Sequence, residues 1–215
     1  MLHNITMQLR LLPLFPLRVV VFPRTALPLH IFEDRYKEMV SEAIRDNTEF
    51  GIVLAKEEGI VSTGCSVVVE KVFQMYPDGR MDILARGRRR FEIQSLSEER
   101  AYIEADVTYF DDEDFEPTPE ELRAQAVAYY QGLRPLSSAE GRGEPDLSDP
   151  QLSFQVAQCL PDLDFLASLL RQRSEKERLL ELNRYLAAYI PRQGAIERMK
   201  DLAPTNGCGP KPAGL

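Results

Sequence analysis

The spacing of apolar residues changes about halfway along the chain. Up to about residue 110, apolar residues come in short β-branched runs such as Val19–Val21, or alternate with polar ones as in 101–110. Both patterns are typical of β-strands. Beyond about residue 118, apolar residues recur every three or four positions, which is typical of helices with one buried face. The pattern therefore predicts a strand-rich first half and a helical second half.

The first half is expected to form a small barrel. Its predicted strands cover 7–12, 18–22, 26–32, 50–55, 66–73, 81–85, 89–94 and 101–110. A helix over 33–46 is predicted from apolar residues on one helical face. Pro77, Asp78 and Gly79 predict a tight turn, because proline presets φ and glycine tolerates a positive φ. Gly87 predicts a bulge or kink. Short strands, tight turns and one crossover helix together favour a partly closed antiparallel barrel.

Capping signals mark the helices of the second half. Thr118 and Ser174 are each followed three residues later by glutamate, and proline follows Thr118, which is typical of a helix start. The predicted helices cover 118–133, 150–160, 162–171 and 174–190, the last of them ended by Pro191. An acidic run over 111–116 and a loop over 134–149 separate these elements. The expected units are a strand-rich domain over 1–113, a helical domain over 117–203 and a disordered tail over 204–215.

Composition excludes several classes of protein. The 215 residues carry a formal net charge of −8, which opposes binding to nucleic acid or to an anionic membrane. Cys65, Cys159 and Cys208 are too far apart to suggest a disulfide framework or a zinc site. No apolar run reaches the roughly 18 residues of a membrane helix, and the apolar N-terminus is interrupted by prolines. We therefore expect an unprocessed cytoplasmic protein without metal or cofactor.

Several segments, in order, resemble one known family. They are 12–17 with 20–23, the run 27–36, Gly64 before the valine strand, 77–80, 85–87 with 90–91, and 166–186. This set is similar to the N-terminal, substrate-binding domain of the Lon protease family and spans about residues 9 to 200. The resemblance implies an α+β fold, in which a strand-rich, PUA-like, partly closed barrel is followed by a helical bundle half. It also implies recognition of unfolded or tagged polypeptide.

The resemblance implies binding without catalysis. In the full-length protease this domain precedes an ATPase and a serine–lysine peptidase, and the phosphate-binding pattern G-x-x-x-x-G-K-[ST] is absent from this sequence. We therefore expect a free-standing module that is not an enzyme and has no catalytic residues. An adaptor or regulator in proteolysis or quality control is the role expected. The residues specify neither a client protein nor an oligomeric state.

Six side chains are candidates for contacting a peptide. Rigid aromatic rings anchor peptides at low entropic cost, and arginine pairs with carboxylates. The candidates are His30, Phe32, Tyr36, Tyr76, Arg88 and Arg90. Strand alternation would place Arg88 and Arg90 on one face and Arg89 on the other. The simpler interpretation of these arginines is a solvated face that pairs with the acidic run.

Two other functions are consistent with single features. PUA-like barrels include RNA-binding proteins, and the arginines at 86 and 88–90 are the feature that favours this alternative. A small hydrolase would require His30 in a Ser–His–Asp set, although a structural or edge position suits this residue better. The acidic run could be a metal or acid/base cluster, but a flexible linker is favoured because its carboxylates have no fixed geometry.

Overall fold

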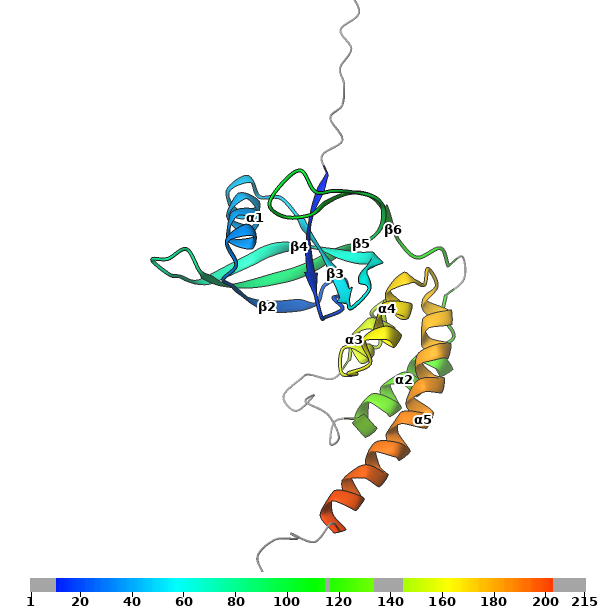
Figure 1. Cartoon of the computed structure of the whole chain (residues 1–215). Helices are drawn as coiled ribbons and strands as arrows, with labels where there is room; N and C mark the ends of the chain where they lie inside the picture. Colours follow the sequence, from blue (N-terminus) through cyan, green and yellow to red (C-terminus); the bar gives the residue numbers. More distant parts are fainter. Residues whose placement is uncertain (1–10, 115–116, 134–144, 203–215) are drawn as a thin grey trace, which may run out of the picture.

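The chain forms a β lobe and a helical lobe (Figure 1). The computed structural model describes residues 11–114, 117–133 and 145–202. The strands of the β lobe are β1 (Leu12–Leu17), β2 (Ala26–Ile31), β3 (Phe50–Lys56), β4 (Gly59–Met75), β5 (Met81–Ser97) and β6 (Glu104–Phe110). They form a six-stranded sheet in the order β2-β5-β4-β3-β1-β6. Because β6 also pairs with β5, the sheet closes on itself and leaves β2 at an edge. The predicted α+β fold with a partly closed barrel is confirmed.

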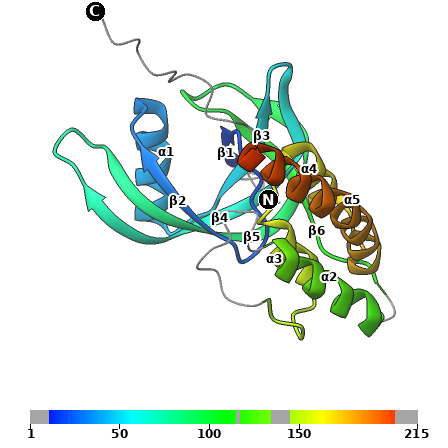
Figure 2. The same ribbon diagram turned by 90° about the horizontal axis from the view of Figure 1, so that it is seen from below.

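The helical lobe packs around one long helix. Its elements are α2 (Glu120–Leu133), α3 (Leu152–Ala157), α4 (Leu163–Arg171) and α5 (Glu175–Leu202). Leu179, Leu182 and Leu186 of α5 are fully buried in its core. Viewed from below, this lobe lies on one side of the barrel and α1 (Asp34–Asp46) on the other (Figure 2).

Local signals located several elements correctly. Helix α1 ends at the predicted residue, and Gly79 adopts the positive φ of 83° that its turn requires. The hydroxyl of Ser174 accepts a hydrogen bond from the backbone N–H of Glu177 at 3.1 Å, which confirms the predicted cap of α5. The residues 1–10, part of the predicted loop over 134–149 and the predicted tail lie outside the described residues.

The start of the sheet differs from its prediction. Strand β1 contains Pro13 and Pro16, whereas the valine run 19–21 is not a strand. Strand β3 pairs with β1 from Leu14 to Leu17, in parallel, and β6 pairs only at Leu12 and Pro13. Each neighbour covers only part of β1, so each proline nitrogen can face the side without a partner. The expected barrel was antiparallel throughout, whereas the observed one contains this parallel pair.

A bulge in β5 changes which arginines face the solvent. Cys65 pairs with Arg90 and Val67 pairs with Gly87, so that Arg88 and Arg89 both lie opposite the single residue Ser66. The extra residue breaks the strand alternation. Arg88 and Arg89 are both exposed and Arg90 is buried, so the predicted shared face of Arg88 and Arg90 is wrong.

Helix α5 does not end at Pro191. It continues through the proline to Leu202. A proline inside a helix removes one backbone hydrogen bond and costs about 3 kcal/mol. The turns that follow are rich in strong helix formers, which favour continuation.

A cluster of buried charges joins the two lobes. Arg90 of β5 and Arg178 of α5 are at most 1% exposed, and both donate to Asp112, which follows β6. The distance is 2.6 Å from each guanidinium to the carboxylate. Arg178 also donates to Glu175 at 2.8 Å, and the hydroxyl of Ser153 donates to the same carboxylate at 2.6 Å. The four charges, two positive and two negative, therefore form one connected network, which we call the interlobe ion cluster.

The interlobe ion cluster corrects two expectations from the sequence. Arg90 is an interior residue, and the acidic run is not a solvated linker at Asp112. Burial alone would raise the pKa of Asp112, but Arg178 and Arg90 lower it below its ordinary value. Burial raises the pKa of Glu175, against the opposing effects of Arg178 and Ser153. The carboxylate of Asp112 is thus the group whose ionised form holds both arginines.

The substitution Asp112→Asn should destabilise the protein strongly. It leaves two buried guanidinium groups without their shared anion, which costs about 3–5 kcal/mol. The exposed neighbour is the matched control, and Asp111→Asn should change stability by less than about 0.5 kcal/mol. Urea unfolding measures both.

The pH dependence of this difference has a defined sign. Because the folded-state pKa of Asp112 is lowered, its contribution is present above the ordinary value of about 3.9 and is lost as the pH falls through the lowered pKa. The gap in unfolding free energy between wild type and Asp112→Asn should therefore be full at neutral pH and shrink in acid. A gap that stayed constant from neutral pH to acid would contradict this assignment.

Candidate functional site

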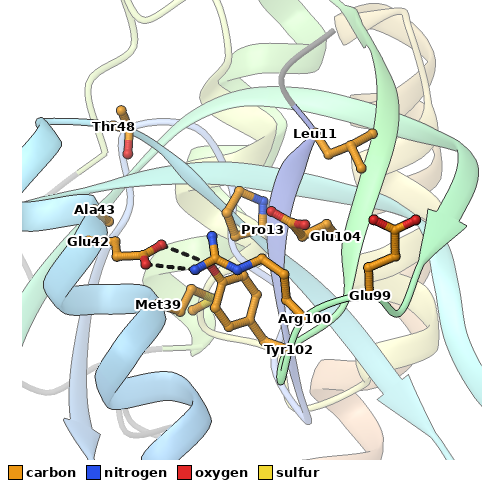
Figure 3. Close-up of a pocket in the computed structure, with 10 residues that line it drawn as sticks. All are labelled: Leu11, Pro13, Met39, Glu42, Ala43, Thr48, Glu99, Arg100, Tyr102 and Glu104. Carbon is orange, nitrogen blue, oxygen red and sulfur yellow. Dashed lines mark hydrogen bonds and ion pairs between the residues drawn. The ribbon is translucent and has the colours of Figure 1, made fainter. Parts of the chain in front are cut away.

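One surface pocket lies between α1 and the segment leading into β6 (Figure 3). It encloses about 510 Å³, and three of its lining residues are glutamates. Arg100 donates to Glu42 at 2.7 Å and to Glu38 at 3.0 Å, and the hydroxyl of Tyr102 donates to Glu42 at 2.9 Å. The hydrogen bond from Arg100 lowers the pKa of Glu42. These groups satisfy one another, so the pocket's main chemistry is the attachment of α1 to the barrel.

A second hollow lies between the lobes, and none of the residues that line it is charged. We call it the interlobe groove. It encloses about 530 Å³ and is lined by Val19, Val20, Val21, Thr25, Ala26, Leu27, Pro28, Gln158, Leu160, Leu163 and Leu166. The barrel side of the lining includes the start of β2, and the helical side comes from the segment after α3 and from the start of α4, elements that can be followed in Figure 1. An uncharged, mostly apolar lining suits an apolar ligand, because a charged group would be desolvated there without a partner.

The wall formed by residues 19–25 is held firmly against β5. A Cβ atom on Gly87 would lie 2.1 Å from the carbonyl oxygen of Phe22, so only glycine allows this close approach. The N–H of Gly87 donates to the carbonyl of Thr25 at 2.9 Å, and the N–H of Arg24 donates to the carbonyl of Gly87 at 2.8 Å.

The same wall is attached to the helical lobe. The ring of Phe22 stacks on Phe154 of α3 at 4.6 Å, and the guanidinium of Arg24 pairs with Asp149 at 2.6 Å. With contacts to both lobes, the wall is fixed in place, and the groove is formed before any ligand arrives.

Three of the six candidate residues come together near the end of β2. The ring of His30 lies 6.0 Å from Phe32 and 6.2 Å from Tyr76. Asp82 connects them, because its carboxylate lies 2.6 Å from Nδ1 of His30 and accepts a hydrogen bond from the hydroxyl of Tyr76 at 2.8 Å. The bonds to His30 and Tyr76 lower the pKa of Asp82. Phe32 is 60% exposed, so this aromatic cluster presents an apolar surface to the solvent.

The other three candidates do not join this cluster. Tyr36 is buried and stacks on Phe15 at 4.0 Å, and Arg90 belongs to the interlobe ion cluster. Neither side chain reaches the surface, so the prediction that they contact a ligand is wrong for both. Arg88 is exposed on β5, with its Nε 4.0 Å from Glu49. None of the six candidates lines the interlobe groove. The sequence signal of the groove residues, a valine run and leucines at helical spacing, is the same as that of a core.

Two described side chains with reactive groups, His30 and Cys65, have structural surroundings that account for them. His30 is the only described histidine, and its contacts are with Asp82 and two aromatic rings. Burial raises the pKa of the Cys65 thiol to about 12, which keeps it protonated at neutral pH. Within the described ranges, no group of three histidine, cysteine or acidic side chains is placed to hold a metal ion. None of the helices described is both long and apolar enough to span a bilayer.

A barrel fixed to a helical lobe around an uncharged groove defines a two-lobed binding module. Comparison with known families agrees, because residues 11–188 match the family described as the ATP-dependent protease La (LON) substrate-binding domain. The chain therefore belongs to the Lon substrate-binding domain family, as its sequence motifs had suggested.

Individual relatives support the same assignment. The chain is 30% identical over 122 residues to a Lon protease of Parabacteroides distasonis, which covers 53% of this chain and 15% of that protein. It is 23% identical over 186 residues to a Lon protease of Flavobacterium johnsoniae, covering 80% of this chain and 22% of that protein. The chain thus spans about a fifth or less of the length of these curated relatives.

Two solved structures share the fold. A Lon N-terminal domain protein from Xanthomonas campestris superposes with a TM-score of 0.65 at 24% identity, covering 80% of this chain and 96% of that one. The N-terminal domain of a Mycobacterium avium complex Lon protease gives 0.62 at 17% identity, covering 84% and 100%. At these identities, the likeness establishes the fold alone.

The substitution Gly87→Ala should disturb the groove wall. The added methyl group has no room beside the backbone of Phe22, and such overpacking costs about 1–3 kcal/mol. Gly132 of α2 is the matched control, because a Cβ there would lie 3.5 Å from Ile190, an ordinary contact. Gly132→Ala should be neutral or stabilising by up to about 1 kcal/mol. Thermal unfolding of both variants is the measurement, and equal midpoints would argue against the close approach.

Proposed function

We propose that this protein is a non-catalytic module that binds extended segments of unfolded polypeptide in the interlobe groove. The observation that carries the proposal is the uncharged lining of that groove. Unfolded chains expose apolar side chains that a folded protein buries, and these side chains gain free energy on leaving water. The family description, which names a substrate-binding domain, supports the same function.

The binding surface in this proposal continues beyond the groove. Strand β2 leads from Ala26 and Pro28, at the groove, to His30 and then to Phe32 of the aromatic cluster. The four residue-to-residue steps from Pro28 to Phe32 span about 13 Å of extended chain. One extended segment can therefore contact the groove and the aromatic cluster together. Exposed aromatic rings anchor such segments at low entropic cost.

The cellular role in this proposal is that of an adaptor or regulator in proteolysis or quality control. It would act in the cytoplasm on unfolded or tagged chains. The support is that the relatives are named as Lon proteases, of which this chain matches a minor part. Binding by this chain would therefore concentrate or withhold a substrate.

RNA binding is not proposed as a second function. In the arginine cluster that favoured it, Arg90 is buried, while Arg86 pairs with Glu70 at 2.6 Å and Arg89 lies 3.5 Å from Asp111. The net charge of −8 opposes phosphate binding further.

A direct test compares unfolded and native forms of one polypeptide. Reduced, carboxymethylated lactalbumin carries a fluorescent label, and anisotropy reports its binding to the full chain. We expect dissociation constants on the order of micromolar for the unfolded form and no measurable binding of the native form. Equal affinity for both forms would overturn the proposal.

The substitution Leu163→Glu should weaken this binding by about tenfold or more, because it introduces a carboxylate into the uncharged groove. Leu163 opens α4, where a negative charge suits the helix dipole, but its side chain is half-buried against the helical core, so thermal unfolding of the variant is measured as well. The matched control is Leu96→Glu, on a leucine that is 50% exposed on β5 and outside the groove. Anisotropy titrations with both variants check this, and equal weakening by the two would place the binding elsewhere.

A further inference from the structure

We propose that the bound polypeptide segment adds to the sheet as a further strand, paired with the open edge of β2. This inference rests on the function proposed above and specifies its substrate class. The ligand would be an extended, uncharged segment with β-forming residues, recognised through its backbone as well as its side chains.

The pairing of β2 shows which of its backbone groups are unused. Among the described strands, β5 alone pairs with β2, in one unbroken antiparallel register from Ala26 to Ile31. In an antiparallel pair, alternate residues direct both backbone groups to the partner. Thr25 is in phase with this alternation, since its carbonyl accepts from Gly87. The backbone N–H and C=O groups of Leu27, Leu29 and Ile31 therefore point toward β5. The backbone groups of Ala26, Pro28 and His30 point toward the open edge.

Proline at position 28 agrees with this assignment. It has no N–H to donate, so a strand tolerates it only where the nitrogen points away from the ladder. The open edge consequently offers donors at Ala26 and His30 and acceptors at Ala26, Pro28 and His30. The missing donor at Pro28 weakens the edge as a template for permanent pairing, as natural edge strands commonly require.

The second long edge of the sheet is less suitable. Strand β3 pairs with β4 only as far as Val67, and no other described strand pairs with Val68–Met75 on that side. Register shifts between Val69 and Lys71 and between Val72 and Gln74 interrupt this edge. Such bulges disrupt the regular spacing of donors and acceptors. Of these two edges, β2 is the one that combines an unbroken register with the interlobe groove.

The uncharged lining beside the open edge determines which kind of segment fits. Ala26 and Pro28 belong both to the edge and to the lining of the interlobe groove, which carries no charged residue. A strand paired there would place side chains against Val20 and Leu163, where an unpaired charge would be desolvated. The complementary ligand is therefore a neutral run of valine, threonine or similar residues, which also favour the extended conformation.

Hydrogen exchange measured by NMR tests the pairing directly. The probe is a peptide of about nine residues alternating valine and threonine, with lysine pairs at both ends for solubility. In the free protein the amides of Leu27, Leu29 and Ile31 should exchange slowly and those of Ala26 and His30 rapidly. Saturation with peptide should slow Ala26 and His30 by at least about tenfold.

Two variants at one position separate backbone pairing from shape. Ala26→Pro removes a donor that faces the open edge and leaves the ladder to β5 intact, so peptide affinity should fall by about tenfold. Ala26→Val is the matched control, because valine has a similar volume and keeps the N–H. Because Ala26 lines the groove, both variants share any effect of the added volume, and Ala26→Val should bind about tenfold more tightly than Ala26→Pro.

The outcomes distinguish this inference from the proposed function. Unchanged exchange at Ala26 and His30 in a saturated complex, or equal affinity of the two variants, would overturn strand addition. Continued sensitivity of binding to Leu163→Glu would then leave the groove as the site. Protection of Ala26 and His30 that rises with protein concentration alone would assign the edge to a second copy of the chain and overturn the inference. If the wild type bound neither the peptide nor unfolded lactalbumin, both proposals would be overturned.

Discussion

The arrangement of this protein depends on the interlobe ion cluster. Its residues come from three places: Arg90 from β5, Asp112 from the segment after β6, and Glu175 and Arg178 from α5. Taking such charges out of water costs free energy that their mutual attraction only partly offsets, so their main physical effect is on geometry rather than on net stability. Any other placement of the lobes would leave a buried charge without its partner. The cluster therefore selects one relative position of barrel and helices.

That position creates the interlobe groove, because neither lobe contains it alone. Val19–Val21 and Pro28 come from the barrel side, and Leu163 and Leu166 come from the helical side. Phe22 crosses the boundary and packs in the helical core, with its carbonyl against Gly87. The molecule thus separates two kinds of interaction. Buried charges fix the lobes from within, and an uncharged surface beside them remains available for a ligand.

The sequence predicted those features that local chemistry determines. Helix α1, the turn at Gly79 and the cap at Ser174 follow from periodicity, turn residues and capping, and the ordered motifs indicated the family. The misassigned residues depend on partners far along the chain. Arg90 looks like its neighbours until a bulge opposite Ser66 turns it inward, and its anion lies 22 residues away. At the candidate site, His30, Phe32 and Tyr76 were predicted because rigid aromatic rings anchor peptides, and the three lie together in the structure. The groove's valines and leucines, in contrast, are indistinguishable from a core by pattern alone.

A preformed groove beside an imperfect edge strand has a consequence for affinity. Because the walls are already fixed by Gly87, Phe154 and Asp149, most of the ordering entropy on binding falls on the ligand. An unfolded segment loses about 1–2 kcal/mol for each residue that it orders, which offsets much of the gain from apolar contact. Pro28 removes one hydrogen bond from the pairing that would otherwise compensate. In the proposed function, these features would keep each complex weak and short-lived, which would suit a module that holds a chain and then releases it.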